Sequence, residues 1–218
     1  MKALRFADRD EARRALAQRL AQMKLEPPIV VLALPRGGVP IGAEVARVLN
    51  AGLDLLLVRK IGAPWQPELA VAAVVDGDRP EVVIDEAMLG MPGVDQEYIE
   101  AQSHLELLEI ARRRALYMKG RERLPIGGTT VIVVDDGIAT GTTVRAALKA
   151  LRRKGPKRLI LAVPVAPADT CRALRAEVDD LVCLSQPEPF RAIGLHYDDF
   201  HQLEDAEVMQ ALAAADKR

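Results

Sequence analysis

The stretch that decides the fold is Val131–Leu148, which reads VIVVDDGIATGTTVRAAL. Its first four residues are apolar and mostly β-branched, a pattern that predicts a strand buried on both faces. Two carboxylates follow, Asp135 and Asp136, and then a loop of small residues. From Val144 onward, apolar residues recur at helical spacing. We therefore expect a strand, a polar turn and a helix, with acid at the carboxyl end of the strand.

The small-residue loop predicts a phosphate-binding site. Small side chains let a phosphate approach the backbone, and the N-terminus of the following helix offers N–H donors and a partial positive charge. Thr140, Thr142 and Thr143 add hydroxyl donors. The two carboxylates would repel a phosphate and suit the hydroxyls of a sugar, or a metal ion. A P-loop would need Lys after Gly141, where this chain has Thr142, and a G-x-G-x-x-G turn is also absent.

This stretch resembles the phosphoribosyl-diphosphate (PRPP) binding motif of type I phosphoribosyltransferases. That motif is an apolar strand, two acids and a loop ending in T-G-x-T, here Thr140–Thr143. The resemblance covers about residues 29–200 and is greatest to a bacterial group known only as predicted phosphoribosyltransferases. It implies an α/β fold with a mostly parallel central sheet flanked by helices. It also implies a small C-terminal hood, an inserted hairpin plus long helix, and a homodimer.

Length and composition are compatible with that fold. The chain has 218 residues, half of them hydrophobic. This suits a single domain, with a core of about residues 29–185 and a hood of about residues 186–203. A net charge of −1 argues against a nucleic-acid-coating protein. The two cysteines, Cys171 and Cys183, have no metal-binding spacing, and they fit a reduced cytoplasmic setting.

The sequence shows no sign of membrane targeting. It begins MKALRFADRDEARR, which is charged from the start and lacks the apolar region of a signal peptide. No apolar run approaches the ~18 residues of a membrane-spanning helix. Asp8 and Glu11 have the spacing of a capping box, so a helix should begin just after Asp8.

Two further strands should end at the same edge of the sheet. Ile29–Leu34 precedes the glycine-rich run Pro35–Gly38, and Leu53–Val58 ends in Arg59-Lys60. In a parallel sheet these carboxyl ends share the edge where ligands bind. The resemblance implies that Arg36, Gly37 and Gly38 form a pyrophosphate-binding loop and that Lys60 reaches the phosphates. The alternatives are an ordinary turn with a surface arginine and a pair of solvated charges.

The next segment, Ile61–Pro67, is expected to be an irregular loop from its Gly and Pro content. It resembles the mobile catalytic loop of the family, in which Trp65 would either cover the site or pack on the surface. Beyond it, residues 70–75 and 81–84 suggest a hairpin, and residues 95–118 a long charged helix whose role stays open. Ala139 stands where 6-oxopurine enzymes carry a third Asp, which argues against those acceptors. Glu68 is then a speculative substitute for the general base.

The C-terminal aromatic residues resemble the hood that binds the acceptor base. Phe190 and Tyr197 are our candidates for stacking on that base. The alternative is that these aromatics simply pack a small appendage. His196 stands where some relatives carry an Asp that contacts the metal, so that contact is in doubt here.

The resemblance thus implies a Mg²⁺-dependent transfer from PRPP to a small-molecule nitrogen acceptor. Residues 139–143 would hold the 5′-phosphate, and Asp135 and Asp136 would accept hydrogen bonds from the ribose hydroxyls. Mg²⁺ would bridge the ribose diol and the pyrophosphate, and the two acids would contact it only indirectly, through ribose or water.

Two other classes of function stay open at this point. A regulatory protein could use the same site to sense PRPP or a nucleotide without turnover. The basic runs at 112–114 and 152–154 leave room for a nucleic-acid contact in that case. A phosphohydrolase is weaker, because its D-x-D-x-T arrangement is absent.

Overall fold

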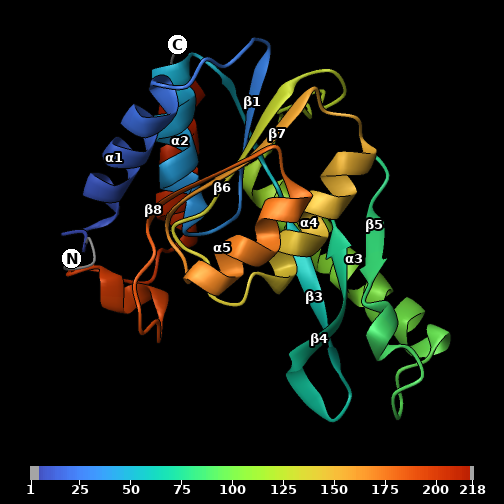
Figure 1. Ribbon diagram of the computed structural model, residues 1–218. Coiled ribbons are helices and arrows are strands. Elements are labelled where there is room, and N and C mark those ends of the chain that lie inside the picture. The colour runs from blue at the N-terminus through green and yellow to red at the C-terminus, as the bar shows by residue number, and fades with distance from the viewer. Residues whose placement is uncertain (1–4, 217–218) are drawn as a thin grey trace.

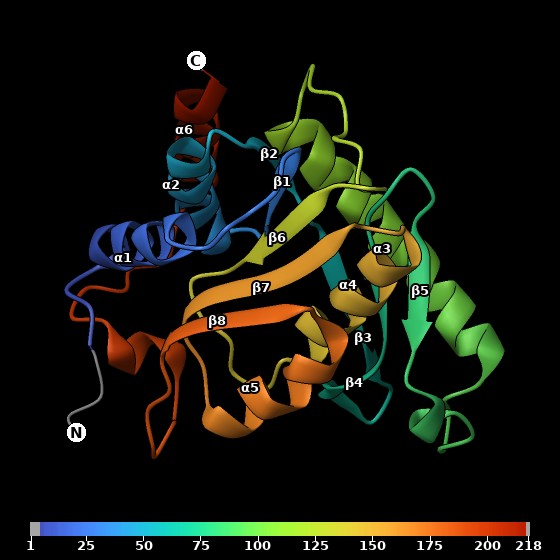
Figure 2. The ribbon, with the colours of Figure 1, turned by 45° about the horizontal axis from the view of Figure 1, so that its top comes forward.

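The computed structural model describes residues 5–216 and is built on a parallel sheet (Figure 1). Met1–Leu4, where a signal peptide would begin, lie outside the described residues. The five strands are hydrogen-bonded in the order β2-β1-β6-β7-β8, all parallel, and Figure 2 shows β6, β7 and β8 side by side. The strands are β1 Ile29–Ala33, β2 Gly52–Leu55, β6 Thr130–Val134, β7 Arg158–Val165 and β8 Asp180–Ser185.

Helices cover both faces of this sheet, so its strands are mostly apolar. One face carries α1 (Arg9–Ala21), α2 (Gly38–Leu49) and α6 (Asp205–Asp216), and the other carries α4 (Thr142–Arg153) and α5 (Ala168–Leu174). Alternate residues of a strand point to opposite faces. Ile132 and Val134 accordingly pack in the first layer and Val131 and Val133 in the second. This confirms the prediction of a strand buried on both sides.

A second, antiparallel sheet carries the inserted elements. It consists of β3 (Val58–Ala63), β4 (Gln66–Val75) and β5 (Glu81–Ile84), and the long helix α3 (Gln96–Tyr117) packs against it. The sheet and α3 share an apolar core of their own, which includes Ile61, Val71 and Ile99. The predicted hairpin and long helix are therefore confirmed, and a short 3₁₀ turn, Glu86–Met88, follows β5.

Two predictions near this sheet are wrong. The central-sheet strand β2 ends at Leu55, and Arg59-Lys60 lie inside β3 of the second sheet. The chain passes from the first sheet to the second at Leu56 and Leu57. Each leucine is 3% exposed: Leu56 packs into the core of the central sheet, and Leu57 packs into the core that the second sheet shares with α3. An apolar run that continues through both leucines gives no sign of this change.

The segment 61–67 is also more regular than its composition indicates. Most of it belongs to β3 and β4, and only Pro64-Trp65 forms the tip. The Trp65 indole N–H donates to the Pro92 carbonyl oxygen at 3.1 Å, and the Tyr98 hydroxyl donates to the Gly62 carbonyl oxygen at 2.7 Å. These contacts fasten the hairpin to the segment around α3.

The hood and the start of the chain pack together. Phe6 N–H donates to the His196 carbonyl oxygen at 3.0 Å, and Phe6 forms an isolated bridge with Tyr197. Helix α1 then begins after Asp8, whose carboxylate accepts a hydrogen bond from the Glu11 N–H at 2.8 Å. Within residues 5–216, no helix has the length and apolarity needed to cross a membrane.

A buried ion-pair network connects the two sheets with α3. The Arg114 guanidinium lies 3.0 Å from Asp54 at the end of β2 and 2.9 Å from Asp76 just after β4. Both aspartates are 4% exposed. Arg123 also donates to Asp76, at 2.6 Å. These contacts fix the insertion relative to the central sheet.

Replacing Arg114 should therefore destabilise the fold strongly. Arg114→Met leaves two buried carboxylates short of a partner, which costs about 3 kcal/mol. Urea unfolding measures the loss in the free energy of unfolding. The control is Arg47→Met, which breaks an exposed pair with Glu44 and should have a much smaller effect. Equal losses in the two variants would show that the network does not hold the sheets together.

Candidate functional site

The site forms where the carboxyl ends of β1 and β6 lie next to each other. Ala33 pairs with Val134 at the ends of the two strands, and the Leu34 N–H donates to the Val134 carbonyl oxygen at 3.0 Å. The run Pro35–Gly38 follows β1, and the run Asp135–Gly141 follows β6. The sequence prediction that these two segments share one edge of the sheet is confirmed.

The two loops approach so closely that only glycine fits at two positions. A Cβ atom on Gly37 would lie 2.0 Å from the Asp136 carboxylate, and one on Gly38 would lie 2.7 Å from the Val134 carbonyl oxygen. The Gly38 N–H already donates to the Leu34 carbonyl oxygen at 2.9 Å. Its amide is therefore used within the fold, which differs from the predicted role in binding pyrophosphate.

Asp136 is held by residues from both ends of the chain. The Arg9 Nε donates to its carboxylate at 2.8 Å, and both side chains are 10% exposed. The Arg9 guanidinium also lies over the Phe200 ring, 3.8 Å from its centroid, and donates to the His201 carbonyl oxygen at 2.7 Å. The Tyr197 hydroxyl donates to the Asp136 backbone carbonyl at 2.5 Å. Asp136 is therefore fixed and its charge is compensated.

Asp135 has no such cation. Among residues 5–216 it forms no ion pair, and its carboxylate accepts a hydrogen bond from the Asp136 N–H at 2.8 Å. Burial raises the pKa of Asp135 well above its usual value, and the neighbouring charge of Asp136 raises it further. Burial also raises the pKa of Asp136, although Arg9 opposes that rise. Among the described residues, Asp135 is thus the carboxyl group of the pair that forms no ion pair, although the charge of Arg9 acts on its pKa in the direction opposite to burial.

The predicted phosphate loop, Ala139–Thr143, contains a left-handed residue at the start of α4. Gly141 has φ +75° and is the N-cap of that helix. Beside it, the Thr170 hydroxyl of α5 donates to the Ala139 carbonyl oxygen at 2.7 Å. Ala139, Thr140 and Thr142 are exposed, so the loop presents its free side to solvent.

A cavity of about 470 Å³ connects this loop to the second sheet. Lys60 of β3 lines it together with Thr140, Thr142 and Thr143. The ammonium group of Lys60 pairs at 2.6 Å with Glu68, whose side chain is 87% exposed. Lys60 thus lies next to the predicted phosphate loop, which it reaches from the second sheet and not from the end of a central strand as predicted.

Arg36 lies at the same edge with a weak partner. Its guanidinium is 3.9 Å from the Asp205 carboxylate, and 30% of its side chain is exposed. Because an ion pair at that distance and exposure is weak, the guanidinium remains available to an anion.

The two predicted stacking residues lie in different surroundings. Phe190 is partly exposed and stacks on His196, with ring centroids 5.0 Å apart. Tyr197 is 2% exposed and packs against Phe6 and Phe200. No face of Tyr197 is open to an acceptor, so the structure places it as a support for Asp136 instead of a stacking platform.

Comparison with known proteins agrees with this geometry. The family model described as "Phosphoribosyl transferase domain" matches residues 7–199. The chain belongs to the phosphoribosyl transferase family. It is 43% identical over 210 residues to the Mycobacterium tuberculosis H37Rv protein named "Putative phosphoribosyl transferase Rv0571c". The match covers 96% of this chain and 47% of that protein, so the chain spans about half the length of this curated relative.

A solved structure of similar sequence has the same fold. The crystal structure of TT1426 from Thermus thermophilus is 41% identical and superposes with a TM-score of 0.82. The match covers 95% of this chain and 97% of that one. The predicted family and fold class of this chain are therefore confirmed.

Asp135 and Asp136 suit a magnesium ion only in a site to which substrate phosphates and water also contribute ligands. Among residues 5–216 no group of three or more His, Cys, Asp or Glu side chains could hold a metal by itself. Mg²⁺, however, is commonly held by one or two carboxylates together with substrate phosphates and water. The uncompensated carboxyl group of Asp135 suits that mode of binding.

Sequence reasoning missed four side chains at this candidate site. Arg9 and Thr170 come from α1 and α5, far along the chain from the loop that they hold. Arg145 and Lys149 of α4 line the same cavity as Lys60. Their spacing, three and seven residues after Thr142, was the one signal that could have placed them on the loop's side of the helix.

The raised pKa of Asp135 predicts a pH-dependent cost to stability. The folded state binds this proton more tightly than the unfolded state, so stability should fall as pH rises above the unfolded pKa. Asp135→Asn removes the cost, and its melting temperature should exceed the wild type by more at pH 8 than at pH 4.5. Thermal unfolding in metal-free buffer measures this. Exposed Asp169→Asn is the control, and a gain independent of pH would contradict the assignment.

Proposed function

We propose that this protein transfers a phosphoribosyl group from PRPP to a nitrogen acceptor, a nucleobase or an amine, and releases pyrophosphate. The observation that carries the proposal is the meeting of the β1 and β6 loops at one edge of the sheet. That edge combines a small-residue loop at a helix N-terminus with a carboxylate pair. Two cations lie beside it: Arg36, whose ion pair is weak, and Lys60 of the second sheet, which is paired with Glu68. Phosphate, ribose and pyrophosphate each find a chemically suitable group there.

The loop Ala139–Thr143 binds the 5′-phosphate in this proposal. Its exposed backbone and hydroxyls face solvent, and Thr170 keeps its shape by bonding to Ala139. Lys60 reaches the same cavity and takes the pyrophosphate together with Arg36. The Gly37 amide can contribute a further donor, whereas the Gly38 amide is occupied.

The two carboxylates have different roles at the ribose in this proposal. Asp136 is neutralised by Arg9, so it positions the loop and accepts from a ribose hydroxyl without adding net charge. Asp135 forms no ion pair among the described residues, and the positive charge that develops on the ribose as pyrophosphate leaves would favour its ionised form, so it is our candidate to stabilise that charge. Mg²⁺, when bound, would neutralise the leaving pyrophosphate.

The acceptor would enter from the hood side. Phe190 has a partly exposed ring, and it is our candidate for contact with the acceptor. Glu68 remains a candidate general base because its carboxylate is exposed at the hairpin. We place the reaction in the cytoplasm, a proposal that the two free cysteines, Cys171 and Cys183, support because neither forms a disulfide.

The proposal is tested by PRPP binding and by pyrophosphate release with Mg²⁺ across a panel of nucleobases and amines. Thr140→Val removes one hydroxyl from the loop and should weaken PRPP binding about tenfold or more, because a hydrogen bond to a charged group contributes roughly 1.5–3 kcal/mol. Thr140→Ala with Gly141→Val should abolish binding, since valine is strained at φ +75°. Arg152→Met, at the far end of α4, is the control.

The outcomes separate the enzyme from a sensor. Unchanged PRPP affinity in folded Thr140→Val would remove the loop from the site. Tight binding by the intact protein without pyrophosphate release, whichever base or amine is supplied, would favour a regulatory protein that senses PRPP.

The Lys60–Glu68 pair gives a second prediction with opposite expectations for its two members. Lys60→Met removes a cation and should weaken PRPP binding about tenfold or more. Glu68→Gln releases Lys60 and should leave affinity unchanged or raise it. If Glu68 is the base, the same variant should lower the rate of transfer. Calorimetry and pyrophosphate release measure the two effects, and equal losses of affinity in both variants would contradict this division.

A further inference from the structure

The cavity beside the predicted phosphate loop is larger than a single phosphate group requires. Its volume is about 470 Å³, which lies in the range of cavities that hold a small organic ligand. Helix α4 forms one wall, and β4, β5 and the turn after β5 form the other. Figure 2 shows α4 beside this second sheet. The cavity therefore extends from the predicted phosphate loop along α4 and has room for further ligand atoms.

The α4 wall of this cavity carries two cations that have no partner. Arg145 and Lys149 follow Thr142 by three and seven residues, a spacing that puts the three side chains on one side of the helix. All three line the cavity. In the part of the chain that the structure describes, neither Arg145 nor Lys149 forms an ion pair or a side-chain hydrogen bond. Because like charges four residues apart on a helix repel each other, this wall favours an anion.

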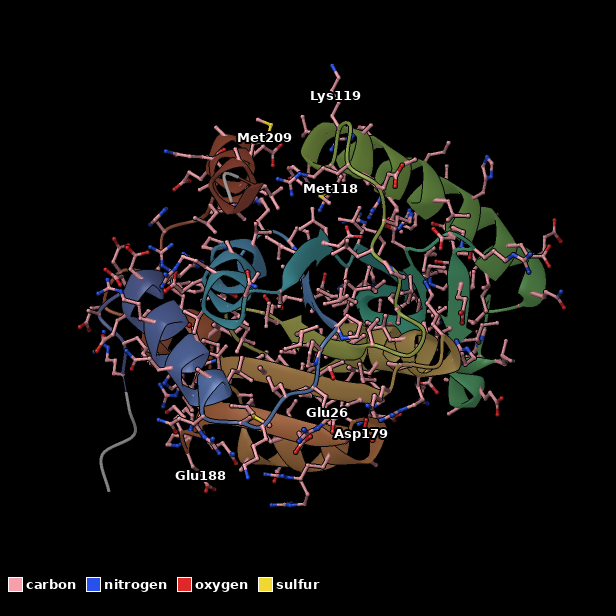
Figure 3. The ribbon with its side chains drawn as sticks, turned by 90° about the horizontal axis from the view of Figure 1, so that it is seen from above. Glu26, Met118, Lys119, Asp179, Glu188 and Met209 are labelled. Carbon is pink, nitrogen blue, oxygen red and sulfur yellow. The ribbon has the colours of Figure 1, made fainter. Side chains whose placement is uncertain are left out.

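The two arginines at the other end of α4 are both paired. The Arg152 guanidinium lies 2.9 Å from the carboxylate of Asp179, which Figure 3 labels just before β8. The Arg153 Nε donates to the Glu81 carboxylate of β5 at 2.6 Å. The helix therefore pairs the arginines that lie away from the cavity. This contrast supports a role in ligand binding for the two unpaired cations.

The opposite wall of the cavity carries two acids. Asp85 and Glu86 line it at the end of β5, and the Asp85 carboxylate also accepts a hydrogen bond from the Ala87 N–H at 3.2 Å. A bare anion would be repelled by this wall. A polyphosphate that carries Mg²⁺ suits both walls, because Mg²⁺ is commonly held by one or two carboxylates together with substrate phosphates.

We propose that this cavity binds the second and third phosphates of a nucleoside 5′-di- or triphosphate, with Arg145 and Lys149 as their cationic partners. The inference rests on the proposed function, in which the loop Ala139–Thr143 holds a 5′-phosphate. The further phosphates continue from that loop along α4, and their magnesium ion lies toward the acidic wall.

PRPP has a single phosphate at its 5′ end, so it leaves Arg145 and Lys149 free. Lys60, which lines the cavity from β3, keeps its proposed role toward the pyrophosphate of PRPP. Because a nucleoside triphosphate and PRPP would share the phosphate loop, each excludes the other. The site would then respond to nucleoside polyphosphates as well as to PRPP.

Calorimetry with adenosine and uridine 5′-mono-, di- and triphosphates in the presence of Mg²⁺ tests the proposal. The wild type should bind a triphosphate about tenfold more tightly, or better, than the monophosphate of the same nucleoside, because each added phosphate gains a charge-assisted contact. Arg145→Met with Lys149→Met should remove this gain and leave the affinities for the monophosphate and for PRPP within about threefold of the wild type. Equal affinity of the wild type for mono- and triphosphates, or a gain that survives in the double variant, would overturn the proposal.

Two controls separate the charge of these residues from the stability of the helix. Arg145→Lys with Lys149→Arg keeps both charges and should keep most of the gain. Arg152→Met changes a paired arginine of the same helix and should leave the gain unchanged. Circular dichroism checks that each variant is folded. A loss of the gain in Arg152→Met as large as that in the double methionine variant would contradict a specific role for Arg145 and Lys149.

Competition with PRPP tests where the polyphosphate binds. Adenosine 5′-triphosphate should raise the apparent Kd of PRPP in proportion to its own concentration, because both ligands use the phosphate loop. Simultaneous binding of the two would place the polyphosphate elsewhere and overturn the proposal. If PRPP and the monophosphates bind but the triphosphates gain nothing, this inference fails and the proposed function stands. If neither PRPP nor any nucleotide binds, the proposed function fails with it.

Discussion

The contact between the β1 loop and the β6 loop is the constraint on which the rest of the site depends. The parallel pairing of Ala33 with Val134 brings the loops so close that Gly37 has no room for a side chain beside Asp136. Asp136 is then held from one side by Arg9 of α1 and from the other by Tyr197 of the hood. Both ends of the chain are thereby drawn to the same edge of the sheet, and the pieces of the site cannot move independently.

This arrangement places two adjacent carboxyl groups where burial disfavours their charge. Arg9 relieves one of them, and Asp135 has no counterpart. Groups whose pKa is raised by burial next to a like charge are common at functional sites, where stability is given up for chemistry. The same reasoning separates this pair from the Arg114 network, in which every buried aspartate has a cation and whose role is to join the two sheets.

Local sequence patterns predicted the features that depend on neighbouring residues in the chain. The run of β-branched residues before Asp135 gave the central strand, and Asp8 with Glu11 gave the start of α1. The partners of Asp136 could not be predicted, because Arg9 is 127 positions away in the chain and only the fold brings it near. Gly and Pro made 61–67 resemble a loop, but pairing with β4 and the bonds to Pro92 and Tyr98 make it a hairpin. Arg59-Lys60 were placed on the wrong sheet because nothing local marks the change at Leu56-Leu57.

The anchored hairpin tip has a practical consequence. Trp65 is the sole tryptophan of the chain, it is about half exposed, and its indole N–H is bonded to the Pro92 carbonyl. Indole emission depends on exposure and on hydrogen bonding, and no second tryptophan contributes background. The intrinsic fluorescence of the protein therefore reports on one place only, the clasp between the hairpin and the segment before α3. Any ligand that opens or tightens this clasp can be followed in unlabelled protein, in real time.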